Sequence, residues 1–176
     1  MTITEKRAVA PIGSKSTHGV QDVFYIRLLE PEGLVLDVFQ NNKADNQQVI
    51  AYPLNEGLNQ QWEFVPAGAP GWWYLRTKMG TGFVLTLAAS GSIVVSRPAE
   101  DERDDQLWCL SPTMAPGYWT VQSKSVVSNA LDPKVIGISS NTSGGTSGGA
   151  PNAVSVTLDY AAFKGQAWAF APLFKP

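Results

Sequence analysis

Three side-chain amides stand directly before a tryptophan in the stretch NQQWEF, residues 59–64. Amide side chains both donate and accept hydrogen bonds, whereas a large indole is buried on average. A surface strand has little use for Trp62, and a buried strand has little use for the amides. The stretch therefore predicts a row of residues that serves a core on one side and polar chemistry on the other.

A carboxylate raises the same question earlier in the chain. Asp37 interrupts the apolar run LVLDVF, residues 34–39, where an unpaired buried charge would be costly. Because side chains alternate between the two faces of a strand, we expect Asp37 to point away from Leu36 and out of the core. The alternative is a residue that stabilises its own hairpin through the backbone.

A threefold repeat organises these residues. The pattern Gln-x-Trp occurs at 60–62, 106–108 and 166–168, and a recurring pattern of this kind indicates a repeat architecture. The segment that starts at residue 24 overlays without gaps on those that start at 73 and 119, which places Leu131 opposite Leu36 and Asp132 opposite Asp37. Three units therefore begin near residues 24, 73 and 119.

Each unit is predicted to contain short strands and no long helix. Runs such as VFYIRLL, GLVLDVF, QQVIAY and QWEFV are rich in β-branched and aromatic residues and lack helical spacing. Four strands in each of three units close naturally into a small barrel with a hairpin cap. The repeated tryptophans Trp62, Trp108 and Trp168 would then form layers of one core, and the Gly/Ser-rich segment 139–152 would be a flexible loop.

Composition limits the class of protein. The chain has 176 residues, 16% of them charged, and a net charge of -2, which favours one folded domain and gives no basic surface for nucleic acid. No apolar run is long enough for a membrane span. The N-terminus lacks the apolar segment of a signal peptide and Cys109 is the only cysteine, so we expect a cytoplasmic protein, with unconventional release left open.

The residues of an enzyme are missing from this sequence. One histidine, one cysteine and no phosphate-cradling glycine loop give no catalytic constellation, no metal site and no cofactor site. The carboxylates between residues 100 and 105 are expected to form a solvated loop. We therefore expect a binding protein.

The repeats resemble those of the ricin-B-type β-trefoil lectins. GLVLDV and VIAYPLNEGLNQQWEF of the first unit contain, in order, the Leu-Asp-Val strand, the aromatic and the Asn-Gln-x-Trp of that family. The resemblance implies an all-β β-trefoil of three pseudo-symmetric four-stranded repeats over residues 23–176, preceded by an arm at 1–22. The three units would span about 23–70, 71–115 and 116–173.

The resemblance also implies non-covalent binding of glycans, of the galactose or N-acetylgalactosamine type. In the first unit the binding residues would be Asp37, Tyr52, Asn59 and Gln60, although Ile50 stands where similar repeats often have a polar residue. Such shallow sites bind weakly, so avidity through several sites or a homodimer is expected.

The other two units keep less of this pattern. The second has Thr86 in place of the aspartate, Arg97 or Pro98 in place of the aromatic, and Asp105 in place of the asparagine, which favours a lost site. A site in the third unit would consist of Asp132, Tyr160 and Gln166; Gly165 replaces the asparagine there, and Phe163 is the alternative aromatic.

A second function remains compatible with a β-trefoil. A protease inhibitor of this fold acts through a surface loop, and segment 139–152 is the longest candidate loop. Its glycines make it more flexible than an inhibitory loop should be. The complete set of polar residues in the first unit favours the lectin.

Overall fold

The computed structural model describes residues 23–99, 101–126, 134–138, 154–160 and 166–173. The N-terminal arm, Asp132, the loop 139–152, Phe163 and Gly165 lie outside these residues. No helix in the described part of the chain is long and apolar enough to cross a membrane.

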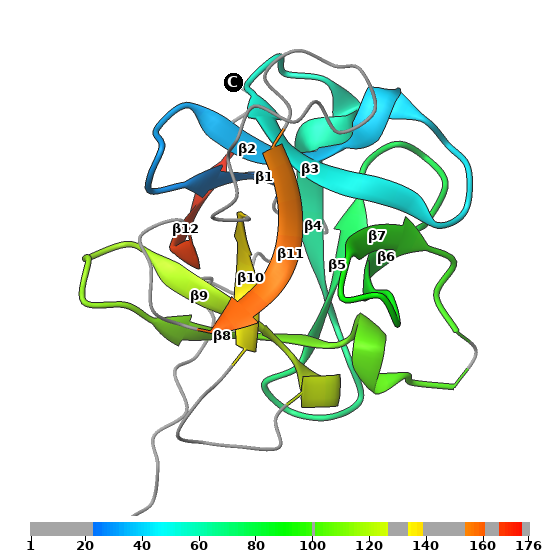
Figure 1. The fold of residues 1–176 in the computed structure, drawn as a ribbon. Helices are drawn as coiled ribbons and strands as arrows, with labels where there is room; N and C mark the ends of the chain where they lie inside the picture. Colours follow the sequence, from blue (N-terminus) through cyan, green and yellow to red (C-terminus); the bar gives the residue numbers. More distant parts are fainter. Residues whose placement is uncertain (1–22, 100, 127–133, 139–153, 161–165, 174–176) are drawn as a thin grey trace, which may run out of the picture.

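The described residues form twelve strands that belong to one sheet (Figure 1). The strands are β1 (Val23–Leu28), β2 (Leu34–Val38), β3 (Gln47–Pro53), β4 (Gln61–Pro66), β5 (Trp73–Thr77), β6 (Val84–Leu87), β7 (Ile93–Ser96), β8 (Trp108–Pro112), β9 (Trp119–Ser123), β10 (Lys134–Ile138), β11 (Val154–Tyr160) and β12 (Trp168–Pro172). Four 3-10 turns lie between them: η1 (Phe39–Asn41), η2 (Leu58–Gln60), η3 (Asp104–Gln106) and η4 (Lys124–Val126). The four strands predicted for the first unit are all confirmed.

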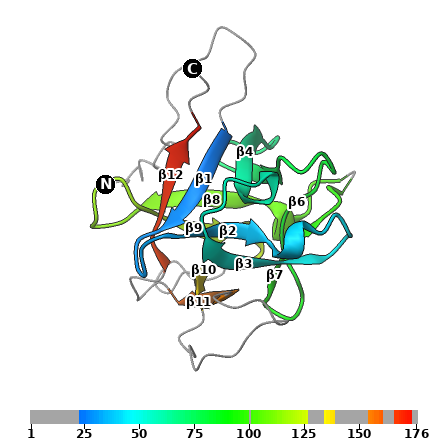
Figure 2. The same cartoon turned by 90° about the horizontal axis from the view of Figure 1, so that it is seen from above.

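Six of the strands close into a ring, and the other six form three hairpins. The ring runs β1, β12, β9, β8, β5 and β4, and β4 pairs with β1 again. The hairpins are β2–β3, β6–β7 and β10–β11. The view from above shows the hairpins gathered on one side of the ring strands (Figure 2). This arrangement is the predicted β-trefoil.

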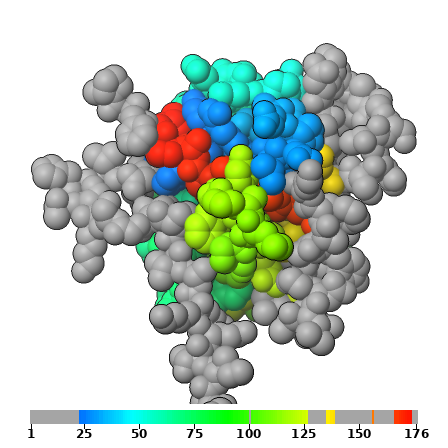
Figure 3. All heavy atoms as spheres, turned by 90° about the vertical axis from the view of Figure 1, so that its left-hand side faces the viewer, coloured from blue at the N-terminus to red at the C-terminus, as the bar shows by residue number. Residues whose placement is uncertain are grey.

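Closure of the ring brings the two ends of the described chain together. β12 pairs with β1 along its whole length, from Phe24 opposite Pro172 to Leu28 opposite Trp168. On one face of the molecule, the blue residues near the start of the described chain and the red residues near its end lie next to the yellow-green segment between β8 and β9 (Figure 3). The first unit therefore depends on the last strand of the third.

The three repeat tryptophans occupy equivalent places in the core. Each is fully buried, and each indole N–H donates to a backbone carbonyl in the second strand of its own unit. The pairs are Trp62 with Leu36 (3.1 Å), Trp108 with Leu85 (2.9 Å) and Trp168 with Ile136 (2.9 Å). The prediction that these indoles belong to the core is confirmed.

The register of the third unit differs from the gapless overlay. Val35, Val84 and Val135 hold equivalent positions, opposite Arg27, Arg76 and Gln122. The separation within these pairs is eight residues in the first two units and thirteen in the third. The third unit therefore has five extra residues before β10, and the predicted equivalence of Leu131 with Leu36 and of Asp132 with Asp37 is wrong.

Candidate functional site

The first unit encloses a cavity of about 420 Å³ beside its hairpin. β2 and β3 provide one wall, and the rest comes from η1, from η2 and from the segment that joins β3 to η2. The lining residues are Asp37, Phe39, Gln40, Asn41, Ile50, Tyr52, Asn55, Gly57 and Asn59. Three of the four residues predicted for the first site thus line one cavity.

Asp37 lies at the buried end of this cavity. Leu36 and Val38 face the hydrophobic core, so strand alternation turns Asp37 to the opposite face, as predicted. The side chain is nevertheless only 2% exposed, because η2 covers that face. Burial raises the pKa of Asp37 to about 6, against hydrogen bonds from Gln60 and Asn59 that lower it. The carboxylate is therefore mainly ionised at neutral pH, although it is desolvated.

Gln60 holds Asp37 from behind and is not part of the cavity wall. Its Nε2 donates to Asp37 Oδ2 (2.7 Å) and to the carbonyl of Pro53 (2.9 Å), while its Oε1 accepts from the backbone N–H of Asn55 (2.7 Å). The side chain is fully buried. Its amide is thus committed to the protein, which makes Gln60 a positioning residue for the carboxylate.

Asn59 reaches the cavity because a glycine lies next to it. Its Nδ2 donates to the carbonyl of Val38 at 3.4 Å, and its side chain also bonds Asp37. A Cβ on Gly57 would lie 2.3 Å from Asn59 Oδ1 and 2.9 Å from Asn55 Oδ1, closer than atoms can pack. Gly57 therefore makes room for both amides.

The outer part of the cavity combines an aromatic ring with a strained turn. Tyr52 is half-buried in the wall, and Ile50 lies opposite Asp37 in the strand register. Gln40 and Asn41 line the cavity with positive φ angles of 57° and 52°, which few residues other than glycine adopt. Sequence reasoning did not identify these two residues, because only the backbone conformation of η1 brings them to the site.

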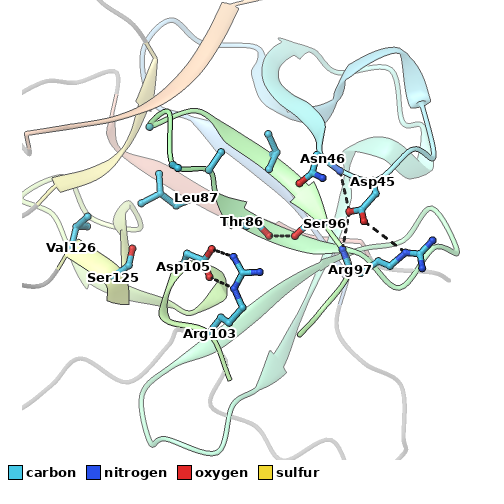
Figure 4. A pocket seen from close by; sticks show the side chains of 14 residues that line it. Asp45, Asn46, Thr86, Leu87, Ser96, Arg97, Arg103, Asp105, Ser125 and Val126 are labelled. Atoms are coloured by element: carbon cyan, nitrogen blue, oxygen red, sulfur yellow. Dashed lines mark hydrogen bonds and ion pairs between the residues drawn. The ribbon is translucent and has the colours of Figure 1, made fainter. Parts of the chain in front are cut away.

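The second unit forms a larger cavity, of about 790 Å³. Thr86 takes the position of Asp37, as predicted, and Asp105 takes that of Asn59 (Figure 4). Val84 pairs with Ser96 just as Val35 pairs with Tyr52. The residue at the aromatic position is therefore Ser96, and the prediction of Arg97 or Pro98 is corrected by one or two residues.

The third unit does not reproduce the first site. The register places Gly137 at the position of Asp37, opposite Thr157, and Asp159 at the position of Tyr52. Tyr160 lies one residue further along β11, opposite Lys134. Gln166 is buried and equivalent to Gln60, whereas Asp132 lies outside the described residues. The strand register thus gives no support to a third site copied from the first.

The carboxylates of the described residues offer little to a metal ion. Among residues 23–99, 101–126 and the later described segments, no group of three or more His, Cys, Asp or Glu side chains is arranged to hold one. Cys109 is half-buried, and its sulfur lies 3.9 Å from Gln122 Oε1.

Comparison with known proteins agrees with the family suggested by the repeats. A family model described as ricin-type beta-trefoil lectin domain-like matches residues 16–95, a range that contains the first cavity and most of the second unit. The resemblance to the ricin-B-type lectins is confirmed. No curated protein sequence matches the chain significantly.

Solved structures share the β-trefoil fold at low sequence identity. A designed threefold-symmetric protein, ThreeFoil, is 20% identical with a TM-score of 0.67, over 86% of this chain and 99% of that one. The C-half of an earthworm R-type lectin in complex with GalNAc is 18% identical with a TM-score of 0.59, over 86% and 99%. An exo-β-1,3-galactanase from Clostridium thermocellum is 18% identical with a TM-score of 0.69, over 88% of this chain but 31% of the enzyme. These likenesses establish the fold.

Proposed function

We propose that this protein is a lectin that binds carbohydrate non-covalently in the cavity of the first unit. The observation that carries the proposal is the pairing of a desolvated carboxylate, Asp37, with the half-buried ring of Tyr52 in one cavity. The activity is binding without catalysis.

The two ends of the cavity fit the two kinds of surface that a sugar presents. Vicinal hydroxyls donate to a carboxylate through charge-assisted hydrogen bonds, and Asp37 keeps acceptor positions beyond those used by Gln60 and Asn59. The C–H face of a pyranose packs on an aromatic ring, which Tyr52 provides. An amide such as that of Asn59 both donates and accepts.

A galactose or N-acetylgalactosamine residue is the ligand that we propose for this site. The proposal is supported by the GalNAc complex of the earthworm lectin and by a further neighbour of the same fold, SeviL, which is bound to asialo-GM1 saccharide. One carboxylate and one ring give affinities on the order of millimolar to tens of micromolar. Glycoconjugates that engage a homodimer would therefore be bound more tightly than free sugar.

A glycan array with a matched pair of variants tests this function. Asp37→Asn removes the charge while it keeps an oxygen that accepts from Gln60, so the fold is retained. The control is Asp101→Asn, the same change at an exposed carboxylate outside the cavity. We expect the native protein and the control to bind glycans with terminal galactose, and Asp37→Asn to lose at least about tenfold in affinity.

Other outcomes on the array would contradict the proposal. Binding that survives Asp37→Asn unchanged would move the site away from the first cavity. A folded protein that binds no glycan at any concentration on the array would refute the lectin function altogether. Circular dichroism of each variant confirms that loss of binding is not loss of fold.

A further inference from the structure

The exposed part of the first cavity is not used by the galactose residue that we propose for its buried end. Asp37 and Asn59 are buried, whereas Gln40 and Asn41 are exposed and line the same cavity from the turn η1. At about 420 Å³ the cavity lies within the range of sites for drug-sized ligands, which are larger than one hexose. The cavity therefore has room for more than one sugar residue.

The side-chain amides of Gln40 and Asn41 are not engaged within the described part of the chain. No hydrogen bond joins either amide to residues 23–99, 101–126 or the later described segments. By contrast, the amide of Gln60 is bonded to Asp37 and to Pro53. Since a side-chain amide both donates and accepts, η1 offers hydrogen-bonding groups of both kinds to a ligand.

The backbone of η1 holds these two residues in a conformation that costs stability. Gln40 and Asn41 have φ angles of 57° and 52°, in the left-handed region that residues other than glycine rarely adopt. Such residues persist only where the surrounding structure fixes them, and they cluster at ligand sites. The strain of η1 therefore indicates that this turn has a function of its own.

The segment that follows η1 is anchored on the second unit. The N–H of Asn42 donates to the carbonyl of Phe39 (3.2 Å) and closes the turn. Asp45 Oδ1 accepts from the backbone N–H of Arg97 (3.2 Å), and Asp45 Oδ2 lies 3.8 Å from Arg97 Nε (Figure 4). Because the segment is fixed at both ends, less conformational freedom is lost when a ligand binds to η1.

Phe39 adds an apolar surface next to the two amides. The residue is half-buried and lines the same cavity, and the three lining residues that η1 contributes carry no charge. Amides that bond hydroxyl groups and a ring that packs on C–H groups form the combination that an uncharged pyranose requires.

We propose that η1 forms a subsite for a second, uncharged sugar residue, the one to which the terminal galactose is linked. The amides of Gln40 and Asn41 bond its hydroxyl groups, and Phe39 packs against its ring. The ligand of the first unit is therefore a disaccharide or the end of a longer neutral glycan. This assignment rests on the proposed function, because the terminal residue is the galactose held at Asp37.

The experiment is a titration of the ¹⁵N-labelled full chain, followed by amide chemical shifts. The probes are methyl β-galactoside and the methyl β-glycosides of lactose, of N-acetyllactosamine and of galactosyl-β1,3-N-acetylgalactosamine, with phenyl β-galactoside as a galactoside whose second group is apolar. We expect at least one disaccharide to bind at least about fivefold more tightly than methyl β-galactoside, since one or two added hydrogen bonds contribute on this scale. Phenyl β-galactoside should bind more weakly than that disaccharide.

A double variant of η1 assigns the gain to this turn. Gln40→Ala combined with Asn41→Ala removes both amides and keeps both β-carbons. The ratio of the affinities for the best disaccharide and for methyl β-galactoside should fall to below about twofold, and measuring both sugars on the same variant cancels any general weakening. The matched control is Asn46→Ala, the same change at an exposed asparagine with a φ of 59° outside the first cavity, which should keep the ratio of the native chain.

Contrary results separate this proposal from the proposed function. Disaccharides that bind no more tightly than methyl β-galactoside would overturn the subsite and leave the lectin function in place. A ratio that survives the double variant would overturn it as well, and so would phenyl β-galactoside that binds as tightly as the best disaccharide. Absence of binding by every probe would refute the proposed function, and the subsite with it.

Discussion

At the scale of single residues, the first cavity holds a charge that the fold does not need for its own stability. Asp37 is buried, and desolvation raises its pKa to about 6 despite the hydrogen bonds from Gln60 and Asn59. A carboxyl group whose pKa rises on folding favours the protonated form in the folded state. The proposed binding role would explain why a carboxylate stands at this place.

Sugar binding by the first site is expected to depend on the ionisation of Asp37. Above pH 6 the carboxylate accepts charge-assisted hydrogen bonds from sugar hydroxyls, and below pH 6 it becomes protonated and loses the charge that strengthens them. Affinity for a galactoside should therefore fall by about tenfold or more between pH 7.5 and pH 4.5. Isothermal titration at several pH values measures this; a flat profile in the native protein would exclude Asp37 as the acceptor.

The raised pKa of Asp37 also predicts how the stability of the fold changes with pH. This change is opposite in sign to the change in sugar affinity. Since the folded pKa of about 6 lies above the ordinary value of 3.8, Asp37 lowers stability above pH 6, and this penalty disappears below about pH 4. The span corresponds to about 3 kcal/mol at most. We expect Asp37→Asn to be more stable than the native chain at pH 7.5, and this advantage should be smaller at pH 4. Urea unfolding of both proteins at the two pH values measures it. An advantage that is no larger at pH 7.5 than at pH 4 would speak against the raised pKa.

Gly57 is expected to matter through space alone. Its φ of -65° is open to any residue, so Gly57→Ala adds no backbone strain, but its Cβ would collide with Asn59 Oδ1. We expect weaker galactoside binding with a small change in stability. Gly33→Ala is the contrasting control: it is strained at φ 88°, meets no atom within 4 Å, and should lose stability while keeping its affinity. Unchanged binding by Gly57→Ala would show that Asn59 is not held by this contact.

At the scale of elements, the repeated glutamine connects the turn before the tryptophan to the hairpin of the same unit. Gln60 bonds the carbonyl of Pro53 and the N–H of Asn55, and Gln106 bonds the equivalent groups of Arg97 and Ala99. The backbone bonds recur although the polar site differs. The glutamine of Gln-x-Trp is therefore first a structural residue, to which the first unit adds Asp37.

Loss of this connection in the second unit should be costly. Gln106→Ala removes the side-chain partner of the Ala99 N–H and of the Arg97 carbonyl and leaves the Ser96 hydroxyl with Thr86 alone, and we expect a loss of about 2–4 kcal/mol. Gln61→Ala, which removes a single exposed bond to the Glu56 carbonyl, should cost less than about 1 kcal/mol. Urea denaturation compares the two, and equal losses would show that the Gln106 network is not important for stability.

The elements also show where sequence reasoning succeeds and where it stops. The strands of the first unit and the core tryptophans follow from β-branched runs and a repeated motif, both of which are local. The overlay of the third unit is wrong because Leu131-Asp132 match Leu36-Asp37 in residue type, whereas the strand pairing selects Ile136-Gly137. Pro133 follows Asp132 directly and is unsuited to a strand interior, while KVIGI just after it is a better strand. The proline and the run that follows it are therefore the sequence signal for the later register.

Parts of the site lay beyond local reasoning. The positive φ angles of Gln40 and Asn41 and the committed amide of Gln60 depend on how the turns fold over the hairpin. The chemistry of the first cavity was predictable from residue types in order, but its walls were not.

At the scale of the whole molecule, the junctions between units are less symmetric than the units themselves. Glu63 on β4 is buried and paired with Arg76 of β5 and with Lys78. The equivalent cross-strand pairs are Cys109 with Gln122 and Ala169 with Arg27. Arg76 thus bridges the first and second units, and among the described residues an ion pair at this position is seen at that junction alone.

The junction between the third and first units is held mainly by packing and strand pairing, which leads to a prediction for the whole fold. β12 pairs with β1 and β9, and Phe170 packs against Phe24 and Phe64 at ring distances of 6.5 and 5.1 Å. Deletion of residues 166–176 removes no residue of the first cavity, yet it opens the ring and removes Trp168 from the core. We expect the shortened chain to lose both its cooperative urea transition and its galactoside binding, because β1 would then lack its longest pairing and the core would be exposed along one side.

Trp168→Phe is the milder comparison: it loses the bond to Ile136 and part of the indole volume, should cost about 2–3 kcal/mol, and should keep binding. A shortened chain that still unfolds cooperatively and binds galactoside would mean that the first two units form a stable body without the third, and that the site requires only its own hairpin.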